Sequence, residues 1–307
     1  MKPIFTLTGN LLWEKKLTFP DWAPGRTQRA AAESFQVGGK GINVARMLAH
    51  LGGPVTALGF PGGATGAECI AWLRAKKIPF RAFRTAAPTR IGIVVCAGQR
   101  RETTFFSPDQ PPAAAALRGC AGFIDARPRR AALAVCGSFP GFDKPAAAPL
   151  RAALDRWLAR ESFLAADTYG PALAWLATRP LDLVKINRQE FDALFPFAAR
   201  RSSVSARLRR ACERWPVRSW IVTDGPRPVW FVEKKSAVPA CLAPPRVREV
   251  SATGSGDVFL ACVLHALLHR RVTLAHAVTF ALPLAAAHAS RPRVAGLVTN
   301  KLLKLRS

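Results

Sequence analysis

Residues 250–259 read Val-Ser-Ala-Thr-Gly-Ser-Gly-Asp-Val-Phe and lead directly into an apolar helix that we expect to end near His269. Gly254 and Gly256 leave the backbone free to turn tightly, so several N–H groups should point outward where this helix begins. A helix start carries about half a positive charge and binds anions. Asp257 is therefore either an acid that only caps the helix or a general base beside an anion hole, and this stretch alone does not separate the two.

A second glycine segment, residues 35–46, reads Phe-Gln-Val-Gly-Gly-Lys-Gly-Ile-Asn-Val-Ala-Arg and runs into an amphipathic helix. Gly38 and Gly39 permit a ligand to approach the backbone closely, while Lys40 and Asn43 offer donors for sugar hydroxyls or a phosphate. The segment lacks the G-K-[ST] ending of a Walker A loop and the spacing of a dinucleotide fingerprint. By itself it is equally well a structural turn or part of a ligand site.

Short β-like segments alternate with helical ones along the rest of the chain, which predicts an α/β fold with a mostly parallel sheet. The expected strands are Pro3–Leu7, Pro54–Gly59, Ile91–Cys96, Ala132–Cys136, Phe163–Ala166, Leu181–Ile186 and Ser219–Thr223. The expected helices are Ile42–Leu51, Ala67–Lys76, Ala146–Arg160, Gln189–Leu194, Ser203–Trp215 and Asp257–His269. The stretches Trp13–Val37 and Phe80–Phe106 do not follow this alternation of strands and helices. The residue types within them alternate, which suggests antiparallel strands that form a small sheet outside the main layer, as a lid would.

Composition bounds the class of protein. The chain has 307 residues, half of them hydrophobic, so it is long enough to bury a large core in one or two domains and is not disordered. Its formal net charge of +26, from 45 Lys+Arg against 19 Asp+Glu, implies attraction to the phosphates of nucleic acid, lipid or metabolites without choosing among them.

The sequence also indicates where the protein works. The first residues show no sustained apolar segment and no apolar stretch reaches the ~18 residues of a membrane span, so we expect a soluble, cytoplasmic protein. Seven cysteines without a C-x-x-C pair favour reduced thiols over disulfides or a zinc site.

The two glycine segments, together with four motifs between them, resemble the ribokinase-like (PfkB) family of carbohydrate kinases over nearly the whole chain. The four motifs are Cys136–Gly141, similar to S-G-S-x-P-x-G; Asp167–Gly170, similar to D-x-x-G; Leu183–Glu190, similar to L-V-K-x-N-x-x-E; and Val222–Gly225, similar to V-T-x-G. The resemblance implies a single domain over residues 1–307. Its expected fold is three-layer α/β/α with a mostly parallel central sheet and a small β-sheet lid formed by about 11–37 and 80–106.

The resemblance also implies roles for particular residues. The implied catalytic set is Asp257 as general base, with the backbone N–H groups of Gly254, Ser255, Gly256 and Asp257 as anion hole for the transferred phosphoryl group. The implied ATP-binding set is Lys185, Asn187, Thr223 and Gly225, and Asn187 with Glu190 would organise Mg²⁺ through water. A need for K⁺ stays open.

The segment Gly-Gly-Lys-Gly-Ile-Asn-Val-Ala is most similar to the 1-phosphofructokinase and tagatose-6-phosphate kinase branch of that family. The implied acceptor-binding residues are Glu14, Arg29, Gly38, Gly39, Lys40, Asn43, Arg90 and Ser138, with Arg29 and Arg90 as cations for the phosphate of the acceptor. One departure concerns the branch pattern T-L-N-P-x-x-D, because residues 6–14 here read Thr-Leu-Thr-Gly-Asn-Leu-Leu-Trp-Glu. Without a gap Leu12 replaces the sugar-binding Asp; with two residues inserted, Asn10 and Glu14 restore the spacing, and we favour the insertion.

The function implied is ATP- and Mg²⁺-dependent phosphoryl transfer to a hydroxyl of a phosphorylated ketohexose, with fructose 1-phosphate first and tagatose 6-phosphate or fructose 6-phosphate next. One alternative is a kinase of the same family for an unphosphorylated sugar or a nucleoside. A second is a non-catalytic protein that binds polyanions. The expected partners are the sugar phosphate, ATP and a second copy of the chain paired through the lid, and neither a membrane nor nucleic acid is expected.

Overall fold

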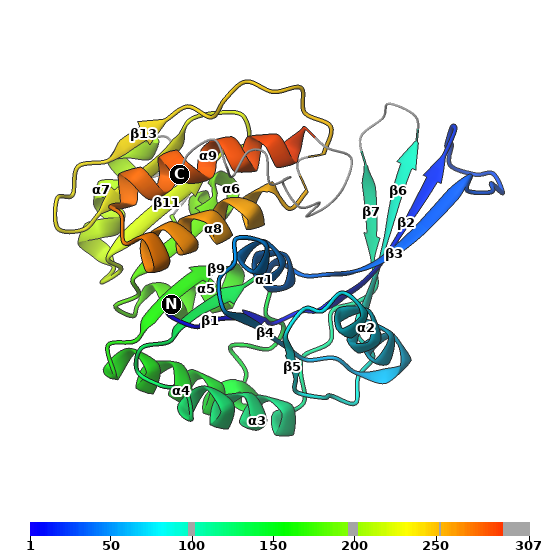
Figure 1. Ribbon diagram of the computed structural model, residues 1–307, viewed down its shortest axis with the longest axis horizontal. Coiled ribbons are helices and arrows are strands. Elements are labelled where there is room, and N and C mark those ends of the chain that lie inside the picture. The colour runs from blue at the N-terminus through cyan, green and yellow to red at the C-terminus, as the bar shows by residue number, and fades with distance from the viewer. Residues whose placement is uncertain (98–101, 196–201, 252, 291–307) are drawn as a thin grey trace.

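The computed structural model describes residues 1–97, 102–195, 202–251 and 253–290 (Figure 1). Its central sheet consists of β1 (Ile4–Thr8), β4 (Val55–Gly59), β5 (Phe80–Ala82), β8 (Ala132–Cys136), β9 (Phe163–Asp167), β10 (Leu183–Asn187), β11 (Ser219–Thr223), β12 (Val229–Glu233) and β13 (Ala240–Leu242). The strand order is β13-β12-β11-β10-β9-β8-β1-β4-β5. Every neighbouring pair from β11 to β5 is parallel, and β12 and β13 extend the sheet antiparallel. The mostly parallel sheet is thereby confirmed.

Helices cover both faces of this sheet. They are α1 (Lys40–His50), α2 (Gly63–Ala75), α3 (Ala114–Asp125), α4 (Ala148–Ala159), α5 (Gly170–Ala177), α6 (Arg188–Asp192), α7 (Val204–Arg214), α8 (Ser255–His265) and α9 (Leu274–Ala289), with a 3-10 turn at Pro145–Ala147 and a π-helical turn at Ala266–Arg270. Side chains alternate across each strand, so Phe5 and Leu7 of β1 pack in one core with α3, α4, α5 and α7, whereas Ile4 packs in the other with α1, α2, α8 and α9. The three-layer α/β/α fold is confirmed.

A separate sheet forms the lid and projects to one side of the main body (Figure 1). It contains β2 (Leu12–Phe19), β3 (Ala32–Gly38), β6 (Arg90–Ala97) and β7 (Thr103–Phe106) in the order β3-β2-β6-β7. The expectation that all its strands are antiparallel is wrong, because β2 and β6 pair in parallel. Both strands leave the main body and run outward, so they point the same way.

The expected lower limit of the lid also needs correction. Residues Phe80–Ala82 pair with β4 as the edge strand β5 of the main sheet, so the second lid segment begins at Arg90. A three-residue strand carries no periodicity that distinguishes it from its neighbours in sequence. The rest of that segment includes residues 98–101, which lie outside the described part.

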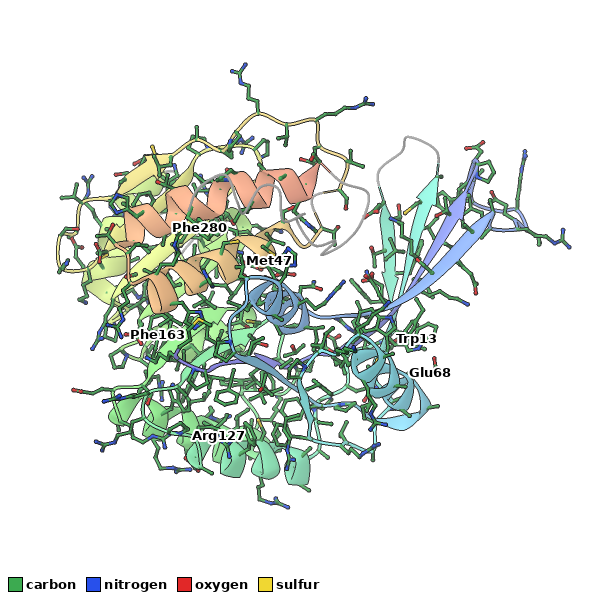
Figure 2. All side chains as sticks on the ribbon, viewed as in Figure 1. Trp13, Met47, Glu68, Arg127, Phe163 and Phe280 are labelled. Carbon is green, nitrogen blue, oxygen red and sulfur yellow. The ribbon has the colours of Figure 1, made fainter. Side chains whose placement is uncertain are left out.

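Hydrogen bonds among the described residues connect the lid to the main body. Trp13 Nε1 of β2 donates to Glu68 Oε2 of α2 at 2.7 Å, and Figure 2 shows these two side chains meeting beside α2. Next to β7, Glu102 accepts from Lys16 Nζ at 2.6 Å and from Ser251 Oγ at 3.3 Å. Because Ser251 precedes α8, the lid touches the first glycine-rich segment directly.

The six predicted helices are present with ends displaced by at most four residues, but α3, α5 and α9 and the strands β12 and β13 were not predicted. Helix α9 contains Pro283, which removes a backbone donor and ordinarily breaks a helix, yet its apolar residues are buried against α8. All seven cysteines are unpaired, as expected. No helix within the described ranges is long and apolar enough to cross a membrane.

Candidate active site

The start of α8 brings the two glycine segments together. Gly254 is the N-cap at φ 84°, a left-handed conformation that favours glycine, and Asp257 follows in the first turn with a side chain that is almost completely buried. Asp257 Oδ2 accepts a hydrogen bond from Asn43 Nδ2 of α1 at 2.8 Å. The predicted base and a predicted acceptor-binding residue, 214 positions apart, are therefore in direct contact.

The surroundings of Asp257 adjust its basicity. The pKa of this carboxyl is raised from 3.8 to about 6. Burial and the negative charge of Asp167 raise it, while Lys40, the hydrogen bond from Asn43 and Lys185 act in the opposite direction. A carboxyl with a pKa near 6 is mostly ionised at neutral pH and still close enough to that pH to accept a proton efficiently.

A buried network of charges lies beside this carboxyl. Asp167, at the end of β9 and fully buried, accepts from Lys40 Nζ on Oδ1 and from Lys185 Nζ on Oδ2, each at 2.8 Å. Lys40 Nζ also donates to Glu190 Oε1 at 3.0 Å. Burial alone would raise the pKa of Asp167, but the charges of Lys185 and Lys40 hold it below 3.8.

No role for Asp167 was predicted from the sequence. Its signal was its place at the carboxyl end of a buried parallel strand, which is the edge where ligands bind in α/β sheets, together with the D-x-x-G motif. Lys40 was predicted among the acceptor-binding residues. Its ammonium group pairs with Asp167 at the end of β9 and with Glu190 after β10. Burial lowers the pKa of Lys40, but the charges of Asp167 and Glu190 outweigh burial and raise it above its usual value.

Lys185, predicted on the nucleotide side, lies directly against the predicted anion hole. A Cβ added at Gly256 would stand 2.9 Å from Lys185 Nζ, so a side chain at that position would press on the ammonium group. Ser255 Oγ, also in the first turn of α8, is buried without a hydrogen-bond partner among the described residues. An oxyanion here would face backbone N–H groups and an ammonium group at once.

Asn187 and Glu190 form a capping box at the start of α6. Asn187 Oδ1 accepts from the backbone N–H of Glu190 at 2.8 Å, and Glu190 Oε2 accepts from the backbone N–H of Asn187 at 2.9 Å. The remaining oxygen of Glu190 faces Lys40. Among the residues described, no three acids, histidines or cysteines cluster as a metal cage. The oxygen donors of Asn187 and Glu190 fit Mg²⁺ held partly by water and by the phosphates of a nucleotide.

Two further residues predicted for ATP lie at the carboxyl end of β11, beside the end of β10. Thr223 Oγ1 donates to the carbonyl oxygen of Ile186 at 3.4 Å, and Gly225 turns the chain at φ 57°. Parallel pairing of β10 and β11 sets Asn187 opposite Thr223. The predicted ATP-binding residues therefore share one edge of the sheet.

On the acceptor side, Glu14 of β2 is buried against the second glycine segment. A Cβ added at Gly38 would lie 3.3 Å from Glu14 Oε2, and the carboxylate accepts a hydrogen bond from Gln36. Burial raises the pKa of Glu14. At Gly39, with φ 118°, a Cβ would stand 2.7 Å from Thr8 Cγ2, so this turn needs glycine. An acid thus faces the glycine turn where the two-residue insertion places it.

Arg90 and Ser138 are bridged at the base of the lid by Asp109, for which no role was predicted, and by Asn10, which the two-residue insertion aligns with the branch pattern. Asp109 Oδ1 accepts from Arg90 Nη1 at 3.0 Å and from Asn10 Nδ2 at 2.8 Å, and the same Asn10 Nδ2 donates to Ser138 Oγ at 3.1 Å. Arg29 is not brought to this group. It is exposed on the loop between β2 and β3, which lies at the outer end of the lid (Figure 1).

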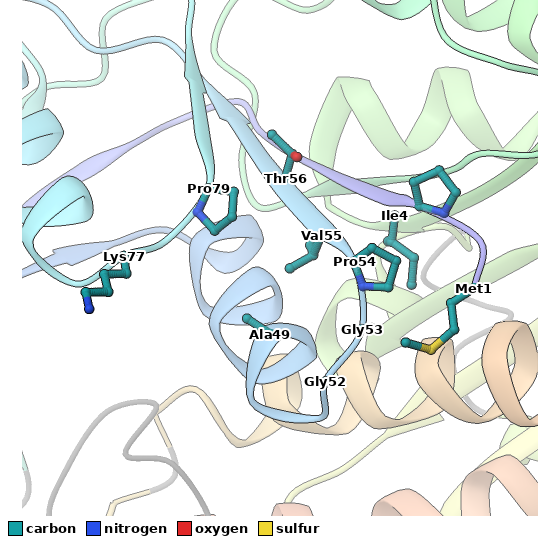
Figure 3. Close-up of a pocket in the computed structure, with 11 residues that line it drawn as sticks. Met1, Ile4, Ala49, Gly52, Gly53, Pro54, Val55, Thr56, Lys77 and Pro79 are labelled. Atoms are coloured by element: carbon teal, nitrogen blue, oxygen red, sulfur yellow. The ribbon is translucent and has the colours of Figure 1, made fainter.

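An open depression at the opposite edge of the sheet does not belong to this site. Figure 3 shows it at the amino ends of β1 and β4, lined by residues such as Met1, Ile4, Pro54 and Lys77. In a parallel sheet the amino ends lie away from the edge that carries Asp167 and Asn187.

Comparison with known proteins agrees with this geometry. The profile of the pfkB family of carbohydrate kinases matches residues 11–299. A 1-phosphofructokinase of Xanthomonas campestris pv. campestris is 32% identical over 276 residues, covering 86% of this chain and 83% of the relative. The ATP-dependent 6-phosphofructokinase isozyme 2 of Escherichia coli is 28% identical over 264 residues, with coverages of 84% and 83%. The crystal structure of phosphofructokinase-2 from Escherichia coli in complex with fructose-6-phosphate superposes with a TM-score of 0.83 at 25% identity over 94% of both chains. The chain therefore belongs to the pfkB family of carbohydrate kinases.

Proposed function

We propose that this kinase transfers the γ-phosphoryl group of ATP to a hydroxyl of a phosphorylated ketohexose, with fructose 1-phosphate as the first candidate and fructose 6-phosphate or tagatose 6-phosphate next. The observation that carries the proposal is the 2.8 Å contact between Asn43 and Asp257 at the start of α8. It joins a buried base to the acceptor-side glycine turn beside a cluster of donors for an anion.

The phosphoryl donor would occupy the edge formed by the ends of β10 and β11 and the start of α8. The backbone N–H groups of Gly254–Asp257 and the ammonium group of Lys185 supply positive potential there, which suits a transferring phosphoryl group. Asn187 and Glu190 would organise Mg²⁺, chiefly through water, and the ion would neutralise charge on the phosphates of ATP. We leave the need for K⁺ open.

The acceptor would lie between Glu14, Asn43 and the base of the lid. Arg90 and Ser138 offer a guanidinium and a hydroxyl for its phosphate, and Glu14 offers a carboxylate for its sugar hydroxyls. The relatives named 1-phosphofructokinase and 6-phosphofructokinase support a sugar phosphate as substrate. Arg29 contributes nothing to this arrangement within one chain.

The chain's own residues account for the proton and for the alignment of the reactants. Asp257 takes the proton of the acceptor hydroxyl while the hydroxyl oxygen forms its bond to the γ-phosphorus, and the bond to the β,γ-bridging oxygen breaks so that ADP leaves with that electron pair. Asn43 holds the receiving carboxylate in place. Positioning and charge neutralisation supply most of the rate in phosphoryl transfer.

A coupled ADP-release assay tests the proposal over a panel of fructose 1-phosphate, fructose 6-phosphate, tagatose 6-phosphate, fructose, ribose and a nucleoside. We expect turnover with at least one ketohexose phosphate and a loss of at least a thousandfold in kcat for Asp257→Asn, because the base is removed. The matched control is Asp182→Asn, a half-buried carboxyl whose pKa is likewise raised by burial but which precedes β10 at the far edge of the sheet. ADP release with no acceptor of the panel, or full activity of Asp257→Asn, would sink the proposal.

We also propose that two copies pair through their lids. Phe105 and Phe106 on the edge strand β7 are 52% and 55% exposed, and apolar side chains on an unpaired strand edge favour association. Light scattering coupled to gel filtration should report twice the chain mass of 33.2 kDa. A monomer at micromolar concentration would contradict the pairing of two copies but not the proposed kinase activity.

A further inference from the structure

The carboxylate of Asp109 lies among the polar groups that we assign to the phosphate of the acceptor. Its Oδ1 accepts from the guanidinium of Arg90 at 3.0 Å and from the amide of Asn10 at 2.8 Å, and that amide also reaches Ser138 Oγ at 3.1 Å. A guanidinium, an amide N–H and a hydroxyl are donors that bind a phosphate oxygen as readily as a carboxylate oxygen. One acidic side chain of the protein therefore engages the donors that a phosphate would need.

The two partners differ in how firmly they are held. Arg90 has only 14% of its side chain exposed and its guanidinium carbon lies 4.5 Å from the centre of the Phe106 ring, whereas 48% of the Asp109 side chain is exposed. Arg90 Nε is buried without a hydrogen-bond partner in the described part of the chain, so the guanidinium retains an unused donor. The cation is fixed and its carboxylate partner is free to turn outward.

The segment that carries Asp109 is tied down on both sides. The backbone N–H of Ser107 donates to the carbonyl oxygen of Ile91 at 2.9 Å, and the backbone N–H of Ala113 donates to Thr85 Oγ1 at 2.9 Å. These anchors hold the backbone on both sides of Asp109. Because about half of the Asp109 side chain is exposed, its ion pair is partly screened by water, and such pairs contribute little stability, so exchange for a phosphate costs little.

We propose that Asp109 is a displaceable occupant of the acceptor-phosphate site and determines selectivity between phosphorylated and unphosphorylated acceptors. A phosphorylated sugar must displace the carboxylate from Arg90 and Asn10, because two anions cannot share these donors without repulsion. An unphosphorylated sugar leaves the contact intact. This inference rests on the proposed function, since it assumes that the site at Arg90 receives the phosphate of the acceptor.

Titration calorimetry tests the inference without requiring turnover. We would measure Kd for fructose 1-phosphate, fructose 6-phosphate and fructose, in the presence of Mg²⁺ and a non-hydrolysable ATP analogue, with the wild type and with Asp109→Asn and Asp109→Ala. Removing the competing charge should tighten binding of the sugar phosphates about fivefold or more and leave the Kd of fructose unchanged. The matched control is Asp155→Asn, because Asp155 pairs with Arg179 at 3.2 Å and is 49% exposed, far from the site.

Three results would overturn the inference. The first is an unchanged or weaker affinity of both Asp109 variants for the sugar phosphates while their melting temperatures match that of Asp155→Asn. The second is an equal gain for fructose, which would show that the loop and not the charge was altered. The third is a lack of binding of either sugar phosphate to all variants. Failure of the proposed function is distinguishable, because a wild type that binds sugar phosphates but releases no ADP contradicts turnover and leaves the role of Asp109 intact.

Discussion

Replacing Asp167 by asparagine removes the negative charge that two buried ammonium groups share. Lys40 Nζ and Lys185 Nζ each lie 2.8 Å from one of its oxygens, and the Asp167 and Lys185 side chains are almost inaccessible to solvent. Removing one partner of a buried pair leaves uncompensated charge in a medium of low polarity, which costs about 3–5 kcal/mol. Because Lys40 keeps Glu190 as a partner, we expect the free energy of unfolding to fall by an amount near the lower end of this range, about 3 kcal/mol.

This loss of stability should depend on pH, and the direction of the dependence follows from the pKa of Asp167. The lysines hold the pKa of Asp167 below 3.8 in the folded chain, so its contribution to stability is complete above pH 4 and fades as pH falls through the folded pKa. Urea unfolding of the wild type and of Asp167→Asn should therefore differ by about 3 kcal/mol at pH 7, and the difference should shrink below pH 4. The exposed pair Asp155–Arg179 provides the control, since Asp155→Asn should cost about 1 kcal/mol or less.

The same substitution should alter the acidity of the base. The charge of Asp167 is one of the causes that raise the pKa of Asp257 to about 6, and without it both lysines favour the ionised form of Asp257 more strongly. The acid limb of the kcat/KM profile of Asp167→Asn, measured by ADP release, should move down by about one pH unit. A stability loss below 1 kcal/mol together with an unmoved acid limb would refute this account of the site.

Four more outcomes follow from the described contacts. For the wild type, log kcat/KM should rise with unit slope up to pH ~6 and then level off, because Asp257 must be ionised to act and its pKa is about 6; a limb centred near pH 4 would contradict this. That raised pKa also means that ionised Asp257 destabilises the fold above pH 6, so Asp257→Asn should be about 1–3 kcal/mol more stable than wild type at pH 8 and no more stable below pH 4, as measured by urea unfolding. Gly256→Ala should lower kcat at least tenfold with a small change in melting temperature, since the added Cβ displaces the ammonium end of Lys185, whereas Gly122→Ala in α3, with no atom within 4 Å, should keep full activity. Of the seven thiols, Cys241 alone is exposed and should react first with a thiol reagent under native conditions, with the half-buried Cys96 next; fast reaction of further thiols would contradict the burial of the other five.

The layered fold could be predicted because each of its strands is short, apolar and followed by a recognisable turn. Ala132–Cys136 and Ser219–Thr223 were predicted with their final bounds, since both are buried on two faces and read as continuous apolar runs. Helix α9 was not predicted because local preference argues against a helix through Pro283, whereas the cap by Thr273 and packing against α8 stabilise the helix. The pairing direction of β2 with β6 depends on where both strands leave the main body, which is a property of the three-dimensional path.

The site could be predicted as a set of residue types but not as a set of partners. The glycine segments identified Asp257 and Asn43, yet nothing in the sequence indicated that these two would touch each other. Lys40 was assigned to the acceptor because it stands between glycines of the acceptor-side turn, while its long side chain reaches Asp167 and Glu190 on the other side. Asp109 lies in none of the recognised motifs, and its ion pair with Arg90 is a consequence of how the lid strands return to the main body.

The surplus of positive charge does not reach the predicted catalytic centre. Around the start of α8, Lys40 and Lys185 face the carboxylates of Asp167, Glu190 and Asp257, so this group carries one net negative charge before any substrate arrives. Strong local positive potential would bind ATP and ADP alike and slow product release, whereas a nearly neutral centre favours a nucleotide only together with its cation. The +26 of the whole chain acts at longer range, where it raises the encounter rate with anionic substrates and weakens as salt increases. Raising the ionic strength should therefore lower kcat/KM for the phosphorylated acceptor with little change in kcat, and an equal fall of both would place the surplus charge at the chemical step instead.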